Sequence, residues 1–238
     1  MFGAGKLRDR SVHLGRWRLG EISVLKGTDM VKGLEPGKRA ALLISECQNG
    51  IVGGGMSGSP LAAEVSKRSI LPKIAELAEA FRAAGLPVMH CTITLPPDLK
   101  GWNVNCVLAA RLAKEAKLIS GSEAAAVVPE IPVLHGDSVV ERHHGMSPFT
   151  GTGLDAELRR HGIDAVVLAG VSTNIALPGA ATEAVGLGYH VILAEDCVAG
   201  GTAETHQLQI TMHLPLIATI SDSASIVQAI NAKPEARP

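Results

Sequence analysis

The chain has 238 residues, of which 46% are hydrophobic and 19% are charged, and its 22 basic residues almost balance its 23 acidic ones. This length and hydrophobic content are sufficient for one domain with a large core. The net charge of -1 gives no electrostatic reason to expect nucleic acid as a partner, because nucleic-acid binding normally requires a marked basic excess.

Membrane insertion and secretion are not expected either. No apolar stretch reaches about 18 residues, and the first ten residues carry charges where a signal peptide needs an apolar core. The four cysteines, at positions 47, 91, 106 and 197, form no CxxC pair. This pattern fits free thiols in a reducing compartment rather than a zinc site, so we expect a cytoplasmic protein without a membrane partner.

Residues 1–37 are predicted to form an extension ahead of the main domain, which we place at 38–232, with a short tail at 233–238. The extension is basic at first and has no sustained periodicity, and Trp17 and Leu19 are among its apolar residues. Two interpretations remain open for it. The extension covers its own domain, or it reaches a neighbouring subunit where its apolar residues are buried.

The first strand is predicted at residues 40–45, AALLIS, and it ends at Glu46 and Gln48. A carboxylate at the end of a buried parallel strand lies at the edge of the sheet where α/β proteins bind ligands. Residues 50–60 form a Gly-rich and Ser-rich loop, which is either a lid over that edge or a plain connection. A helix with an apolar stripe follows at 69–84.

A second strand is predicted at 86–92, a helix at 106–118 and a third strand at 139–141. Trp102, between the second strand and the helix, is either a platform for a small ligand or an anchor for its loop. The third strand leads into Arg142, His143 and His144. Adjacent residues of an extended segment point in opposite directions, so we expect no metal site from the two histidines. A further helix is predicted at 154–161.

Residues 163–188 are the segment around which the rest is organised. Residues 163–169 are almost continuously apolar and predict a central strand, and Gly170 ends it. Ser172, Thr173 and Asn174 then precede a helix rich in small residues. Such an elbow places backbone N–H groups and the positive end of a helix dipole at the carboxyl edge of the sheet, where we expect chemistry.

The remaining elements are a strand at 189–194, a helix at 203–213, a strand at 216–220 and a helix at 224–231. Strands and helices therefore alternate, with short connections. The predicted fold class is α/β, a doubly wound and mostly parallel six-stranded sheet with helices on both faces.

The segment 170–176, GVSTNIA, followed by Ala184 and Gly188, resembles the signature of the isochorismatase-like hydrolases, also called the cysteine hydrolase superfamily. The resemblance extends over about 40–230. In most members the position that matches Ala176 is the nucleophilic cysteine, set at the start of a helix that favours a thiolate. Because alanine offers no nucleophile, the usual acyl-enzyme route cannot pass through this position.

The resemblance also implies roles for other residues. Glu46 occupies the place of the family's general-base Asp, one methylene longer. The family's Lys corresponds to Arg142 or His143, depending on one inserted loop residue, and we favour Arg142 because it carries a permanent charge. The peptide before Ser172 is expected to be cis, with the Ser172 and Ala176 amides forming an oxyanion-type pair. Further substrate contacts are expected from Gln48, Asn174, Trp102 and Phe149.

These features predict a hydrolase of a small-molecule substrate that uses carboxylate acid or base catalysis by Glu46, with water as the nucleophile and without a cofactor or metal. The alternative is a catalytically inactive binding or oligomeric scaffold that keeps the pocket. In either case the resemblance implies a homo-oligomer, a dimer or a tetramer.

Overall fold

The computed structural model describes residues 30–53 and 59–232. It contains one sheet of six parallel strands, in the order β3-β2-β1-β4-β5-β6. The strands are β1 (Ala40–Ser45), β2 (Val88–Ile93), β3 (Ser138–Arg142), β4 (Ala165–Val171), β5 (His190–Ala199) and β6 (Thr219–Ser221). The predicted α/β fold with a six-stranded sheet is confirmed.

Burial explains why the central strands are so apolar. Every residue of β1, β2 and β4 is buried, because helices cover both faces of the sheet at these strands. The edge strand β3 instead alternates, with Val139 and Glu141 exposed and Val140 and Arg142 buried. A run of apolar residues therefore marks the middle of the sheet, and alternation marks its edge.

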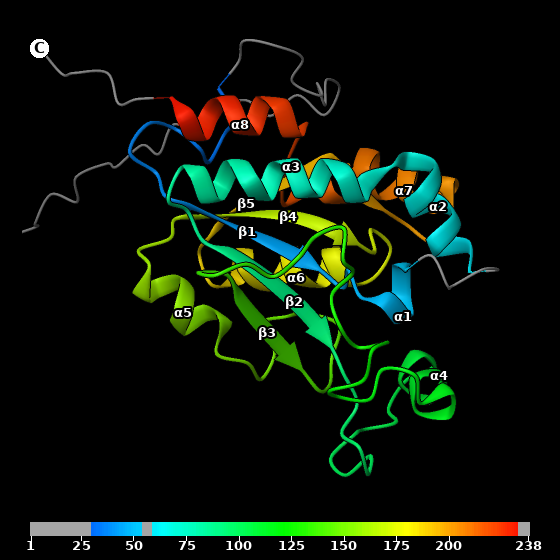
Figure 1. Ribbon diagram of the computed structural model, residues 1–238. Helices are drawn as coiled ribbons and strands as arrows, with labels where there is room; N and C mark the ends of the chain where they lie inside the picture. The colour runs from blue at the N-terminus through cyan, green and yellow to red at the C-terminus, as the bar shows by residue number, and fades with distance from the viewer. Residues whose placement is uncertain (1–29, 54–58, 233–238) are drawn as a thin grey trace, which may run out of the picture.

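The helices cover the two faces in the way that right-handed crossovers require. Helices α3 (Ile70–Ala83) and α8 (Ser223–Asn231) pack on one face, and α5 (Leu154–Arg160) and α6 (Ala176–Gly186) on the other (Figure 1). The connection from β5 to β6 comprises α7 (Ala203–Leu208), a π-helical segment (Gln209–His213) and a 3₁₀ turn (Leu214–Leu216). The shorter helices are α1 (Asn49–Val52), α2 (Pro60–Arg68) and α4 (Val107–Glu115).

Several element boundaries differ from the prediction for local reasons. Helix α2 was not predicted, although Ser59 caps it and Pro60 begins it. Strand β5 continues to Ala199, past the predicted end at 194, with a register shift in its pairing to β4. Strand β6 begins only at Thr219, because the 3₁₀ turn that contains Pro215 occupies the predicted start.

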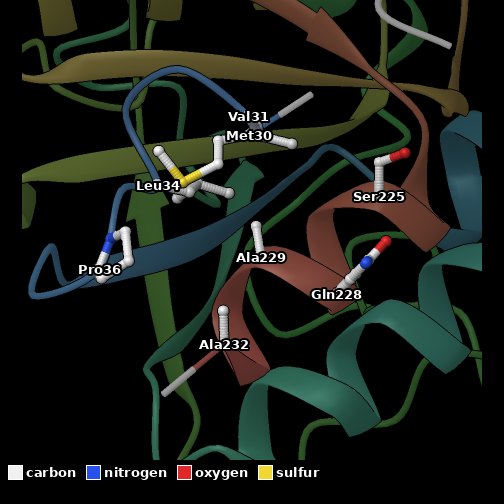
Figure 2. A pocket seen from close by; sticks show the side chains of 8 residues that line it. All are labelled: Met30, Val31, Leu34, Pro36, Ser225, Gln228, Ala229 and Ala232. Carbon is white, nitrogen blue, oxygen red and sulfur yellow. The ribbon is translucent and has the colours of Figure 1, made fainter. Parts of the chain in front are cut away.

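Residues 30–39, which precede β1, pack against the domain. Val31 and Leu34 are buried in the core on the α8 side of the sheet. This segment and α8 together line a small cavity of about 110 Å³. Figure 2 shows the side chains that line it, among them Leu34 and Ala229. Val31 and Leu34, which the prediction assigned to the extension, therefore pack with the domain. Residues 1–29, the tail at 233–238 and residues 54–58 of the Gly-rich loop lie outside the described residues.

Within the described part of the chain, no helix combines the length and the apolar character that crossing a bilayer demands.

Candidate active site

The ends of β1 and β4 approach each other unusually closely. Ser45 pairs with Gly170 in the parallel ladder, and a side chain at position 170 would overlap the Ser45 carbonyl oxygen. Gly170 also has a φ of +94°, which favours glycine. This contact places Glu46, the residue after Ser45, beside the elbow that follows Val171.

Glu46 forms an ion pair with Arg142 from the end of β3. The Arg142 Nη2 atom donates a hydrogen bond to Glu46 Oε1, and the side chains are 2% and 15% exposed. The neighbouring His143 is turned away, with Nδ1 3.1 Å from Thr94 Oγ1, because successive strand residues point to opposite faces. The choice that the sequence left open is thus settled: Arg142 supplies the cation beside Glu46.

The Arg142 guanidinium is incompletely satisfied. Its Nε donates weakly to the Gly145 carbonyl oxygen, at 3.4 Å, while the buried Nη1 atom finds no acceptor among the described residues. A buried N–H donor without a partner is costly and rare. The Nη1 group is therefore able to donate a hydrogen bond to an anionic or carbonyl oxygen of a ligand.

The loop after Arg142 is fastened to α6. Ser147 and Thr150 both donate hydrogen bonds from their hydroxyls to the Glu183 carboxylate. A Cβ at Gly179, one turn into α6, would lie 3.2 Å from the Met146 carbonyl oxygen. These contacts bring the chain that carries Arg142 against the first turns of α6.

The elbow between β4 and α6 contains the predicted cis peptide bond. The Val171–Ser172 peptide bond is cis, and the Ser172 carbonyl oxygen accepts hydrogen bonds from the N–H groups of Ile175 (3.2 Å) and Leu177 (3.1 Å). Ala176 is the first residue of α6 and is 2% exposed. Its N–H belongs to the first turn, where the helix itself provides no acceptor. An oxygen that approaches Ala176 would therefore meet a free donor and the positive end of the helix dipole.

Asn174 makes one hydrogen bond within the fold. Its Oδ1 accepts a hydrogen bond of 2.9 Å from the Gly201 N–H. This contact ties the elbow to the start of the α7 connection.

A buried network behind the elbow escaped the sequence analysis. Thr173 is 0% exposed, and its Oγ1 lies 3.2 Å from Nδ1 of the buried His206. Nε2 of the same ring lies 3.8 Å from Glu195 Oε1, to which Arg68 Nη2 donates at 2.9 Å. His206 and then Arg68 lower the pKa of Glu195 to about 2, although burial acts in the opposite direction. The contact between Thr173 and His206 holds the elbow against α7.

Three residues that were predicted to contact substrate, namely Gln48, Phe149 and Trp102, make contacts within the fold. The Gln48 amide is fully buried and bonds to Ile93 O (3.0 Å), Ala125 O (2.8 Å) and Ile93 N (2.9 Å). The Phe149 ring packs in the core beside Tyr189, with 6.2 Å between ring centroids. Trp102 Nε1 donates to the Ala109 carbonyl oxygen, so the tryptophan anchors its loop. Polar or aromatic type alone did not reveal that these side chains were already engaged.

The cysteines do not replace the missing nucleophile. Burial raises the pKa of the Cys47 and Cys91 thiols to about 12 and also raises that of Cys197, so these three stay neutral and unreactive. The fourth, Cys106, is exposed at the N-cap of α4, where its Sγ accepts the Ala109 N–H. In residues 30–53 and 59–232, no group of three or more His, Cys, Asp or Glu side chains is arranged to hold a metal ion.

Comparison with known proteins agrees with this geometry. A family model described as the isochorismatase domain matches residues 40–225. The chain belongs to the isochorismatase family. The matched region includes Glu46, Arg142 and the complete elbow, and members of this family are hydrolases.

Relatives of known sequence or structure share most of this isochorismatase domain. The chain is 32% identical over 202 residues to the isochorismatase family protein YecD of Escherichia coli O157:H7, covering 81% of this chain and 97% of that protein. It is 28% identical over 172 residues to a maleamate amidohydrolase of Pseudomonas putida, covering 72% and 77%. The solved structure of an isochorismatase family protein from Burkholderia thailandensis superposes with a TM-score of 0.65 at 29% identity, covering 81% and 96%.

Proposed function

We propose that this isochorismatase family member hydrolyses a small molecule by acid or base catalysis at Glu46, without a cysteine nucleophile. The observation that carries the proposal is the buried Glu46–Arg142 pair beside an elbow whose helix begins with Ala176. The neutral, buried state of Cys47, Cys91 and Cys197 supports it, because a thiolate is required for attack.

In the proposed reaction Glu46 transfers protons, and the N–H donors of Arg142 and Ala176 stabilise negative charge. Glu46 accepts a hydrogen bond from Arg142, and its carboxylate can take a proton from an attacking water molecule. The unpartnered Arg142 Nη1 and the Ala176 N–H can donate to the oxygen on which negative charge develops. Water oxygen, rather than a cysteine sulfur, then forms the new bond to the carbonyl carbon. When the C–N or C–O bond breaks, Glu46 returns the proton that it took from water to the leaving amine or alcohol, and no covalent enzyme intermediate is needed.

The substrate screen follows from this chemistry. One relative is a maleamate amidohydrolase, so amides of small carboxylic acids come first, followed by esters and enol ethers. A substrate with an anionic or carbonyl oxygen suits Arg142, which offers a buried cation and a free donor. In an enol ether, Glu46 would have to donate a proton rather than accept one.

The Glu46→Gln variant tests the proposal on the first substrate found. We expect turnover to fall by at least about 100-fold, the typical contribution of one acid or base group, while substrate binding measured by calorimetry remains. Glu115→Gln, an exposed position at the end of α4, is the matched control and should keep wild-type activity. If the wild type turns over no member of the screen but binds some of them, the scaffold function replaces this proposal.

A second variant tests the site without any substrate. In a Cys106→Ser background, which removes the exposed thiol, Ala176→Cys should be alkylated by iodoacetamide faster than free cysteine, because the helix dipole and Arg142 favour a thiolate. Mass spectrometry of the labelled peptide gives the rate. Labelling no faster than that of free cysteine would show that residues 46, 142 and 176 do not share one pocket.

A further inference from the structure

Glu141 and Arg142 are neighbours on β3 and point to opposite faces of the sheet. Arg142 reaches Glu46 in the candidate active site, whereas Glu141 lines a second cavity of about 500 Å³. Residues at β2, at β3 and in the crossing segment 121–133 line this cavity, which we call the β3 cavity. Because successive strand residues alternate between the two faces, the β3 cavity lies on the other side of β3 from the candidate active site.

The walls of the β3 cavity are mostly apolar. Val133 and Val139 line it and are 42% and 52% exposed, and Pro129 and Pro132 line it as well. Figure 1 shows β3 at the edge of the sheet, whereas α3 lies over the central strands. Small-molecule sites typically have volumes of about 300–1,000 Å³ and apolar walls with a few polar groups. The size and lining of the β3 cavity therefore fit a small organic ligand.

Glu141 supplies a charged group to these apolar walls. Burial acts to raise the pKa of Glu141, but hydrogen bonds from Ser120 and Thr94 outweigh it and hold the pKa below its ordinary value. The carboxylate is therefore ionised at neutral pH. Both hydroxyls donate to Oε1, that of Ser120 at 2.6 Å. Within residues 30–53 and 59–232, no donor contacts the other oxygen, Oε2.

Glu141 also lacks the arginine that other carboxylates of the sheet have. Three such pairs are Glu46 with Arg142, Asp137 with Arg82 and Glu195 with Arg68. In the part of the chain that the structure describes, the one basic side chain within 4 Å of Glu141 is His143, whose Nδ1 is 4.0 Å from Oε1. The negative charge that faces the β3 cavity is therefore not matched by a permanent cation of the protein.

A second acceptor lies beside Glu141. Thr92 is its direct partner in the parallel ladder of β2 and β3, so both side chains lie on one face of the sheet. Thr92 lines the β3 cavity and is only 5% exposed, and its hydroxyl forms no hydrogen bond with the described residues. Because an unsatisfied buried hydroxyl is costly, the pair offers a ligand two acceptors, one of them charged.

We propose that the β3 cavity binds a small organic amine. Its ammonium group donates to Glu141 Oε2 and to the Thr92 hydroxyl, and its apolar part packs on the valine and proline side chains. An ammonium group has three donors and no acceptor, which matches a site that offers acceptors. The binding of an amine here is independent of the hydrolysis proposed at Glu46.

Two other classes of ligand fit the β3 cavity less well. A carboxylic acid would place its negative charge beside that of Glu141, where no permanent cation compensates it. A metal ion normally needs several charged or imidazole ligands, and no group of three or more His, Cys, Asp or Glu side chains suited to one occurs in the described ranges.

Benzylamine is the probe that tests the proposal, because it joins an ammonium group to a small apolar ring. Benzyl alcohol is its neutral counterpart, and benzoate is an anionic one. Ligand-observed NMR titrations of the full-length protein near neutral pH give the dissociation constants. We expect benzylamine to bind with a dissociation constant of about 1 mM or lower. Benzyl alcohol and benzoate should bind at least about 10-fold more weakly, because they make no charge-assisted hydrogen bond to Glu141.

Variants of the two acceptors identify the groups that bind the amine. Glu141→Gln keeps an acceptor for Ser120 and Thr94 but removes the charge, so it should raise the benzylamine dissociation constant at least about 10-fold. Thr92→Val keeps the shape of the side chain and should raise it about threefold or more. Glu115→Gln, on the exposed side of α4, is the control that should leave it unchanged. Circular dichroism and the urea midpoint verify that each variant is folded.

Amide chemical shifts of the isotope-labelled wild type locate the bound amine. Benzylamine should shift residues 92–94, 121–133 and 139–141, and leave the elbow at 172–176 unchanged. Shifts confined to the elbow, benzyl alcohol binding as tightly as benzylamine, or an unchanged affinity of Glu141→Gln would each overturn the proposal. Absence of benzylamine binding at concentrations up to about 20 mM would also overturn it.

Discussion

Breaking the Glu46–Arg142 pair should reveal strong coupling between these two residues. The Arg142 side chain is 2% exposed and that of Glu46 is 15% exposed. Removal of one partner from a buried ion pair costs about 3–5 kcal/mol, because the other charge is left without compensation. Glu46→Gln should lower the free energy of unfolding more than Arg142→Met does, because it leaves the more deeply buried guanidinium without a carboxylate partner.

The double variant should lower the free energy of unfolding by much less than the sum of the two single changes. Replacement of both charges leaves no uncompensated ion, and such replacements are often close to neutral. If the two single variants lose about 3–5 kcal/mol each and the double variant loses no more than one of them, the coupling energy is at least about 3 kcal/mol. Urea unfolding at neutral pH, followed by circular dichroism, provides the four free energies of unfolding.

A second cycle on an exposed pair is the control. Asp155 and Arg159 lie four residues apart on α5, with side chains 40% and 52% exposed, so their coupling should stay below about 0.5 kcal/mol. Additive effects at Glu46 and Arg142 would refute the reasoning, because they would mean that water screens both charges.

Two further predictions concern acid sensitivity and the contact between β1 and β4. Burial lowers the pKa of His90 below its ordinary 6.5 despite the neighbouring Asp137 carboxylate. As the pH falls, the unfolded chain therefore binds a proton at His90 before the folded protein does. The free energy of unfolding should consequently be constant above about pH 6.5 and fall below it. The urea midpoint between pH 7.5 and 5 should show this fall, and His90→Gln should flatten it. Gly170→Ala should lower the free energy of unfolding by more than about 3 kcal/mol, because the added methyl group meets the Ser45 backbone. Gly188 has a similar φ of +90° but open space around it, so Gly188→Ala should lower it by only about 1–2 kcal/mol. Equal losses at the two glycines in thermal unfolding would mean that β1 and β4 can separate to admit the side chain.

The order of strands and helices was predictable because its signals are local. The buried strands appear as short apolar runs at 40–45 and 163–169, and Gly170 followed by Ser172 and Thr173 marks the elbow. The elbow and Glu46 could also be placed at one edge of the sheet, since parallel strands of a doubly wound fold present their carboxyl ends together. Neighbouring residues in the sequence are therefore sufficient to predict these features.

The identity of the groups that face one another was decided by tertiary structure. The pattern around the end of β3 allowed either Arg142 or His143 beside Glu46, and only the position of β3 in the sheet selects Arg142. Gln48 offered the same functional groups to a ligand as to the protein, but its amide is already saturated by backbone 45 and 77 residues away.

The same limit applies to the network behind the elbow. Thr173 and His206 are 33 residues apart in the sequence, so no local pattern joins them. Side-chain type shows which interactions a residue is able to make. Packing between distant segments determines which of those interactions are made inside the protein and which remain available to a ligand. The reason is that a donor or acceptor that already has a partner in the fold is no longer free to bind anything else.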